Sequence, residues 1–194
     1  MLPQYFIYIS VLTSLYAGYF YIRDTLKGET KPNRVSWFIW FLVPMIVCLV
    51  QWDNGSKMAF LPIFMSGFIP LLVIIVSFWN PNAYWKLGKI DYICLALSLL
   101  AILSWLYFKT GVPATLFAIL ADGLAFIPTF IKSWRAPSTE TAAPYYSGIF
   151  NGFVSAGTSS VSTFSAIGFA IYLIFANLAE LAILWTRRKA TPSI

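Results

Sequence analysis

Asp122 is the residue whose position most strongly suggests chemistry, because it is the single charge in the apolar run from Thr110 to Ile131. A charged side chain at the centre of a bilayer costs roughly 2.5–3.5 kcal/mol on insertion scales, so it faces a wet cavity or polar groups of other helices. Burial disfavours an ionised carboxyl group, so Asp122 could also exchange a proton with water that reaches it. We expect Asp122 to bind a substrate and a proton; the alternative is a protonated acid that joins two helices.

Trp40 and Asn151 are the next candidates for a binding site. An aromatic ring can stack on the apolar face of a sugar or a flat heterocycle, while an amide hydrogen-bonds its polar groups. Trp37 lies one turn closer to the basic residue Arg34. It is equally compatible with the site and with the belt of aromatic residues found at membrane boundaries.

The sequence offers little for catalysis. It contains no histidine, and its two cysteines, Cys48 and Cys94, lie in apolar stretches, which excludes His-based triads, His/Cys metal sites and a disulfide framework. Asp122 and Glu180 lie in different apolar segments, and Glu180 is expected to pair loosely with Arg187-Arg188 or to extend towards the membrane boundary. We therefore expect no enzyme, catalytic residue, metal or cofactor.

The composition is that of an integral membrane protein. Of the 194 residues, 59% are hydrophobic and only 10% are charged, and the mean hydropathy is +0.76. A spanning helix needs roughly 20 apolar residues, so seven helices would use about 140 and leave no room for a soluble domain. The net charge of +6 is distributed between apolar runs, which is typical of membrane loops and not of nucleic-acid binding.

The uncharged runs predict seven transmembrane helices. They cover residues 4–21, 35–52, part of 58–85, 90–108, 114–131, 144–157 and 164–186. The first run has neither the basic start nor the cleavage pattern of a signal peptide, so we expect it to be retained.

Sorting the basic residues by loop predicts the orientation. One face receives eleven of them, namely Arg23, Lys27, Lys31, Arg34, Lys86, Lys89, Lys132, Arg135, Arg187, Arg188 and Lys189. The other face receives two, Lys57 and Lys109. Because cytoplasmic loops are enriched in Lys and Arg, we expect the N-terminus outside, the C-terminus in the cytoplasm and the chain in the cell membrane.

Two parts of the chain resemble each other. Tyr21-Ile22-Arg23 matches Phe130-Ile131-Lys132, Glu29-Thr30 matches Glu140-Thr141, and Ser36 matches Ser147. This predicts a 3+1+3 parallel repeat, in which 1–85 is the first triple-helix unit, 86–109 is a linker helix and 110–194 is the second unit. In this alignment Asn151 occupies the position of Trp40.

The segment from Pro128 to Arg135, followed by Ser138-Thr139-Glu140-Thr141, resembles the PQ-loop signature, with Thr129 in place of its glutamine. The 3+1+3 arrangement is similar to that of SWEET sugar facilitators, lysosomal PQ-loop amino-acid carriers, bacterial vitamin transporters and the KDEL receptor. The resemblance implies a transporter fold. It also implies that Asn177, an asparagine of the seventh span, faces the substrate.

Pro128 is a candidate hinge. A proline inside a helix removes one backbone hydrogen bond and weakens the helix locally. Pro128 lies near the basic end of the fifth span, where bending would move one unit against the other. A static kink is the alternative.

Together these features predict a carrier that works by alternating access, either facilitative or proton-linked. Its substrate would be a small polar metabolite such as a sugar, amino acid or vitamin, bound at mid-membrane by Asp122, Asn151, Asn177 and Trp40. The alternative is a ligand-binding membrane receptor of the same fold that does not transport. One chain with two units can enclose a pathway, and the sequence leaves substrate, flux direction and oligomeric state open.

Overall fold

The computed structural model describes residues 2–53, 61–108, 111–159 and 161–190, with the side chains of 47–53 and 105 left out. The described residues form seven α helices, one 3-10 turn and no strand. The helices are α1 (Tyr5–Lys27), α2 (Arg34–Asp53), α3 (Leu61–Ser77), α4 (Lys89–Phe108), α5 (Gly111–Arg135), α6 (Ala143–Thr158) and α7 (Phe164–Ala190), and the turn is η1 (Pro137–Thr139). The prediction of an all-α chain is confirmed.

Four helices, α1, α4, α5 and α7, are long and apolar enough to cross a bilayer. The length of an α helix is 1.5 Å for each residue. The shortest helices are therefore α3, with 17 residues, and α6, with 16. A membrane-embedded chain is therefore consistent with the structure.

Helix α1 extends past its predicted end because basic residues can continue a helix at the membrane boundary. It ends where Gly28 takes a left-handed conformation, with φ of 78°, and its N–H caps the carbonyls of Asp24 and Thr25. Glycine adopts this conformation without the steric cost that a Cβ imposes. The turn sends the chain into the loop 29–33 and then into α2.

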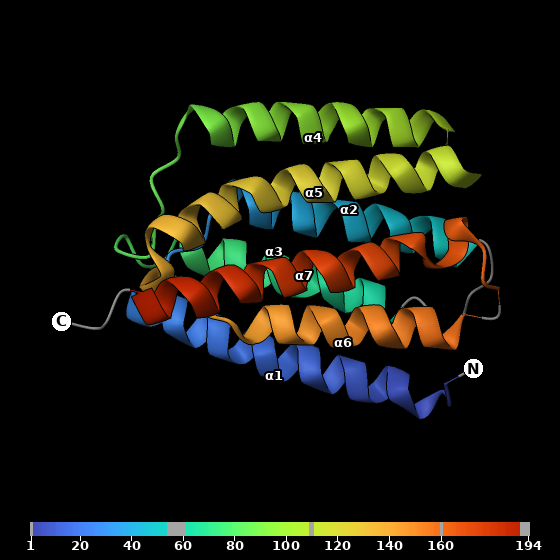
Figure 1. Cartoon of the computed structure of the whole chain (residues 1–194), viewed down its shortest axis with the longest axis horizontal. Helices are drawn as coiled ribbons and strands as arrows, with labels where there is room; N and C mark the ends of the chain where they lie inside the picture. The colour runs from blue at the N-terminus through green and yellow to red at the C-terminus, as the bar shows by residue number, and fades with distance from the viewer. Residues whose placement is uncertain (1, 54–60, 109–110, 160, 191–194) are drawn as a thin grey trace.

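The helices lie side by side along one direction, with α4 at one edge of the bundle (Figure 1). Helix α3 packs against both α1 and α2, and α7 packs in the same way against both α5 and α6. Contacts between these two groups are made by α1 with α6, by α2 with α5 and by α3 with α6. Helix α4 packs against α5 and α2.

Small residues allow the helices to approach closely, as is usual in membranes. A Cβ added at Gly18 of α1 would lie 2.7 Å from Ile69 of α3, and one at Gly152 of α6 would lie 2.8 Å from the carbonyl oxygen of Ala170 in α7. A larger residue at position 18 would displace the Ile69 side chain, and one at position 152 would press against backbone.

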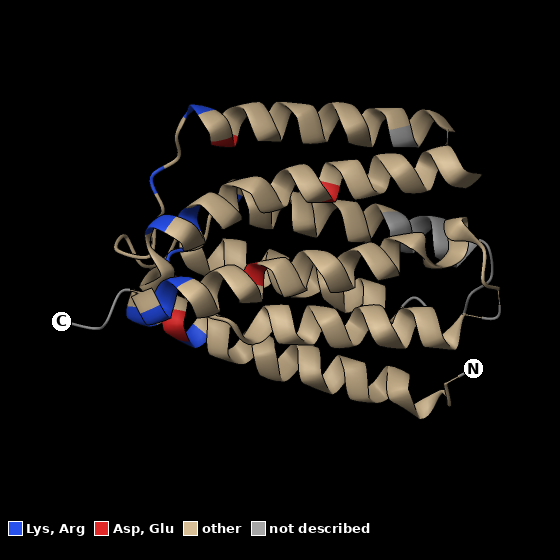
Figure 2. Cartoon of the chain, viewed as in Figure 1, with Lys and Arg blue, Asp and Glu red and all other residues tan. Residues whose placement is uncertain are grey.

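The described lysines and arginines gather at one end of the bundle (Figure 2). This is the end where α1, α5 and α7 finish with basic last turns. The predicted sorting of basic residues therefore holds for every described one. Lys57 and Lys109 lie outside the described residues.

Candidate functional site

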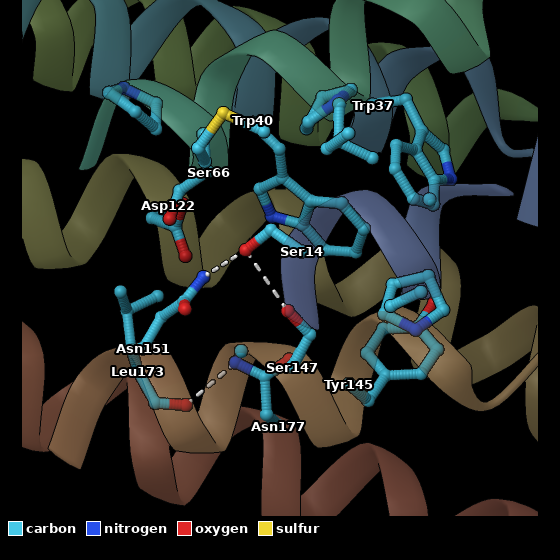
Figure 3. A pocket seen from close by; sticks show the side chains of 18 of the residues that line it. Ser14, Trp37, Trp40, Ser66, Asp122, Tyr145, Ser147, Asn151, Leu173 and Asn177 are labelled. Atoms are coloured by element: carbon cyan, nitrogen blue, oxygen red, sulfur yellow. Dashed lines mark hydrogen bonds between the residues drawn. The ribbon is translucent and has the colours of Figure 1, made fainter. Parts of the chain in front are cut away.

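A cavity of about 100 Å³ lies inside the bundle. Residues of all the described α helices except α4 line it. The four residues predicted to bind substrate, Trp40, Asp122, Asn151 and Asn177, are all among its lining residues (Figure 3). Residues that lie far apart in the sequence are thus brought to one place.

Asp122 is buried in the middle of α5, with 2% of its surface exposed. The hydroxyl of Tyr172, on α7, donates a hydrogen bond of 3.0 Å to its Oδ2 atom. A carboxylate offers about four acceptor positions, so this bond leaves capacity for further donors. The adjacent Gly123 faces Tyr172, whose hydroxyl would lie 3.3 Å from an added Cβ.

A hydrogen-bonded chain joins α1 to α6 beside Asp122. The Asn151 amide donates from Nδ2 to the Ser14 hydroxyl at 2.9 Å, and the Ser14 and Ser147 hydroxyls are 3.2 Å apart. The Ser14 hydroxyl also lies 2.8 Å from the carbonyl of Ser10 in its own helix and donates to it. These contacts fix the Asn151 side chain and direct it towards the cavity.

Three buried polar atoms of residues that line this cavity have no partner among the described residues. They are the indole Nε1 atoms of Trp37 and Trp40, which are donors, and the Oδ1 of Asn151, an acceptor. Trp40 is 8% exposed and Asn151 is 6% exposed. Figure 3 shows the polar ends of Trp40 and Asn151 turned towards Ser14 and Asp122. A buried unsatisfied polar group costs about 1–3 kcal/mol, so a polar solute or water would be stabilised here.

Two further residues are Asn177, the fourth predicted site residue, and Trp37, which the sequence left open between the site and the boundary belt. Asn177 lines the cavity, but its Nδ2 already donates to the Leu173 carbonyl of its own helix at 2.8 Å. Trp37 is 2% exposed and packs against Trp40 and Tyr21, with ring centroids 5.4 Å and 4.4 Å apart. Trp37 therefore lies in the interior and lines the cavity.

The sequence did not reveal three polar residues of this region: Ser14, Ser147 and Tyr172. A serine or tyrosine in an apolar span is common and has no periodicity that marks it. Only Ser147 had a signal, as the repeat partner of Ser36. Its place beside Asn151, one turn along α6, could have been inferred from that spacing.

A second polar cluster lies between the cavity and the basic end. Lys132 and Glu140 are fully buried and form an ion pair, and the Tyr145 hydroxyl donates to Glu140 Oε1 at 2.7 Å. Lys132 also donates to the carbonyl oxygen of Lys31 at 2.8 Å. Tyr145 lines the cavity as well, so the cluster borders it.

Glu180 belongs to this interior region, so it does not extend to the membrane boundary, although the charges of Arg188 and Lys132 still act on it. Its side chain has no exposed surface, and it accepts a hydrogen bond from the Ser133 hydroxyl of α5. Arg187 and Arg188 instead donate to backbone carbonyls of the segment 134–140. Glu180 turns inward because α5 packs against this face of α7 and offers a donor there.

The two loops at the basic end are tied to each other. The hydroxyls of Thr30 and Thr141 are 2.5 Å apart, and Thr141 donates to Asp24 Oδ2 at 2.8 Å. The backbone N–H of Lys31 donates to the Thr139 carbonyl at 2.9 Å. These bonds join the α1–α2 loop to the α5–α6 loop at the basic end of the bundle.

Pro128 is buried inside α5, and the helix continues past it to Arg135. Its role as a hinge stays a prediction.

No family model, curated protein or solved structure matches the chain. The resemblance to PQ-loop and SWEET-like proteins therefore also stays a prediction.

Proposed function

We propose that the chain is a seven-span carrier with a SWEET-like 3+1+3 fold, in which α1–α3 and α5–α7 are the two units and α4 is the linker. The packing order supports this proposal, because the third helix of each group lies between the first and the second. Exchanging the two units converts the α1–α6 contact into an α5–α2 contact, and both contacts are present.

The repeat partners Ser36 and Ser147 add support, because each contacts the first helix of the other unit. Ser36 of α2 accepts a hydrogen bond of 2.8 Å from Thr129 of α5, while its repeat partner Ser147 lies 3.2 Å from Ser14 of α1. Thr30 and Thr141 are themselves repeat partners and are hydrogen-bonded to each other. Residues related by a two-fold axis touch each other only near that axis, so this pair marks where the axis would run.

The function that fits this geometry is transport of a small polar solute by alternating access. The observation that carries the proposal is the cavity between the two groups of helices, with Asp122 and the unpartnered Trp40 and Asn151 atoms on its wall. The hydrogen-bonded loops would close the basic end, and their separation would open it. Binding energy from the solute can shift the balance between these two states.

We further propose that the basic end faces the cytoplasm, as cytoplasmic loops favour Lys and Arg. This places the N-terminus outside and the C-terminus inside the cell membrane. The structure would then be a state closed to the cytoplasm.

Counterflow in proteoliposomes tests the proposal. A thermal-shift screen of sugars, amino acids, amines and vitamins first identifies a binding solute, because a ligand of the folded state raises its apparent stability. Vesicles loaded with that solute should then accumulate its labelled form transiently, above the level of protein-free vesicles. Binding without any accumulation would contradict a carrier and favour the receptor alternative.

A further inference from the structure

The cavity wall carries one acid and no base. Among its lining residues in the described part of the chain, Asp122 is the only Asp or Glu, and none is Lys or Arg. The buried Lys132 outside the wall is already paired with Glu140. An anionic solute would meet a carboxyl group with no compensating positive charge, whereas a cation would neutralise it.

Aromatic rings form much of the remaining wall. Trp40 packs against Phe126 with ring centroids 4.5 Å apart, and against Tyr145 at 6.4 Å. All three residues line the cavity. The faces of aromatic rings attract ammonium groups, and this attraction is stronger where water is excluded.

The hydrogen-bonding groups without partners fit the same kind of ligand. Asn151 Oδ1 is an unused acceptor, and Asp122 accepts only from Tyr172 among the described residues. An ammonium group has three donors and no acceptor, so it can serve both oxygens. The unused donors are the indole Nε1 atoms of Trp40 and Trp37, so the ligand needs an acceptor elsewhere, and Trp40 lies beside Asn151 and Asp122 (Figure 3).

We propose that the cavity binds a small organic ammonium ion that also carries an acceptor such as a hydroxyl group. The Asp122 carboxylate is its counter-ion, Asn151 is its second acceptor and Trp40 donates to its hydroxyl. The inference rests on the proposed function in treating the cavity as a solute site. The cavity, about 100 Å³, is smaller than the roughly 150 Å³ site that holds the six carbons of benzene, so a ligand of about four heavy atoms fits.

Three probes of similar size and different charge test the assignment. Ethanolamine is a cation, ethylene glycol is neutral and glycolate is an anion. Binding of each to the purified full-length chain in neutral detergent is measured by calorimetry. A hydrogen bond to a charged group favours ethanolamine over ethylene glycol by about 10- to 100-fold in Kd, and glycolate is expected to be the weakest.

Two variants and a control assign the effect to named groups. Asp122→Asn should remove the preference for ethanolamine, whereas Glu29→Gln, at an exposed loop acid, should retain it. Trp40→Phe keeps the ring and removes the N–H. It should therefore abolish the advantage of ethanolamine over ethylammonium, expected at about two- to twelvefold.

Equal binding of ethanolamine and ethylene glycol by the wild type, stronger binding of glycolate, or binding of none of the three would overturn the assignment. It would also be overturned by a folded Asp122→Asn variant that keeps the full preference. Asp122-dependent binding without counterflow of labelled ethanolamine would contradict the carrier function and leave the ligand class standing. Counterflow of a neutral solute at the same rate in the wild type and in Asp122→Asn would contradict the ligand class and leave the carrier function standing.

Discussion

The buried ion pair between Lys132 and Glu140 gives a prediction whose size follows from the structure. Both side chains have no exposed surface, and Glu140 also accepts from Tyr145 while Lys132 donates to the Lys31 carbonyl. Removing one partner of such a pair leaves a buried charge without compensation, which costs about 3–5 kcal/mol. Lys132→Met fills a similar volume and removes the charge.

The expected result is a large loss of thermal stability in detergent. For a chain of this length about 2–4 °C of Tm corresponds to 1 kcal/mol, so Lys132→Met should lower Tm by about 6–20 °C. Lys132→Met/Glu140→Gln should recover more than half of that loss, because it removes both charges and leaves an acceptor for Tyr145. The matched control is Lys27→Met, at an exposed lysine of α1.

The measurement is the Tm of each purified variant under one detergent and salt condition. Lys27→Met should stay within about 2 °C of wild type, as surface substitutions usually do. If Lys132→Met also stays within that range, or if the double variant is as unstable as the single one, the cluster does not depend on its charge pairing.

Three further predictions address the hinge, the packing and the topology. Pro128→Ala should restore a helical hydrogen bond and slow solute exchange without weakening solute binding; an unchanged exchange rate would make Pro128 a static kink. Gly152→Ala should destabilise the chain by about 1–3 kcal/mol, because the added methyl group meets the Ala170 carbonyl, and a wild-type Tm would contradict the α6–α7 packing. With the native cysteines replaced, Arg135→Cys in intact cells should react with impermeant thiol reagents only after permeabilisation, whereas Ser162→Cys should react before it; labelling of both from one side would overturn the topology.

The helices could be predicted from the sequence because lipid demands long uncharged segments and leaves charges only at their ends. The run 35–52 corresponds to α2 within one residue at each end. By contrast, α7 continues to Ala190, beyond the predicted 186. Polar residues at a membrane boundary do not by themselves end a helix, so hydropathy marks the lipid region and not the helix end.

Part of the candidate site was also predictable. An acid in mid-span is costly, and that cost identified Asp122. The partner of Asp122 was not predictable, because nothing about Tyr172 distinguishes it from the other tyrosines of an aromatic-rich chain. For Glu180, spacing along one helix gave Arg188 as a charged neighbour, but only the packing of α5 shows that Ser133 donates to it in the interior. Contacts between helices decide such cases, and one sequence does not contain them.

The central claim is that the two loops at the basic end separate during each transport cycle. Thr30 and Thr141 have hydroxyl oxygens 2.5 Å apart, so cysteines at these two positions lie within reach of a disulfide of about 2.05 Å. In Thr30→Cys/Thr141→Cys, with Cys48 and Cys94 replaced, oxidation should reduce counterflow of the bound solute to the protein-free level, and a reductant should restore it. Solute binding should persist in the oxidised protein. Counterflow that continues at the same rate in the fully cross-linked protein would contradict alternating access through this end of the bundle.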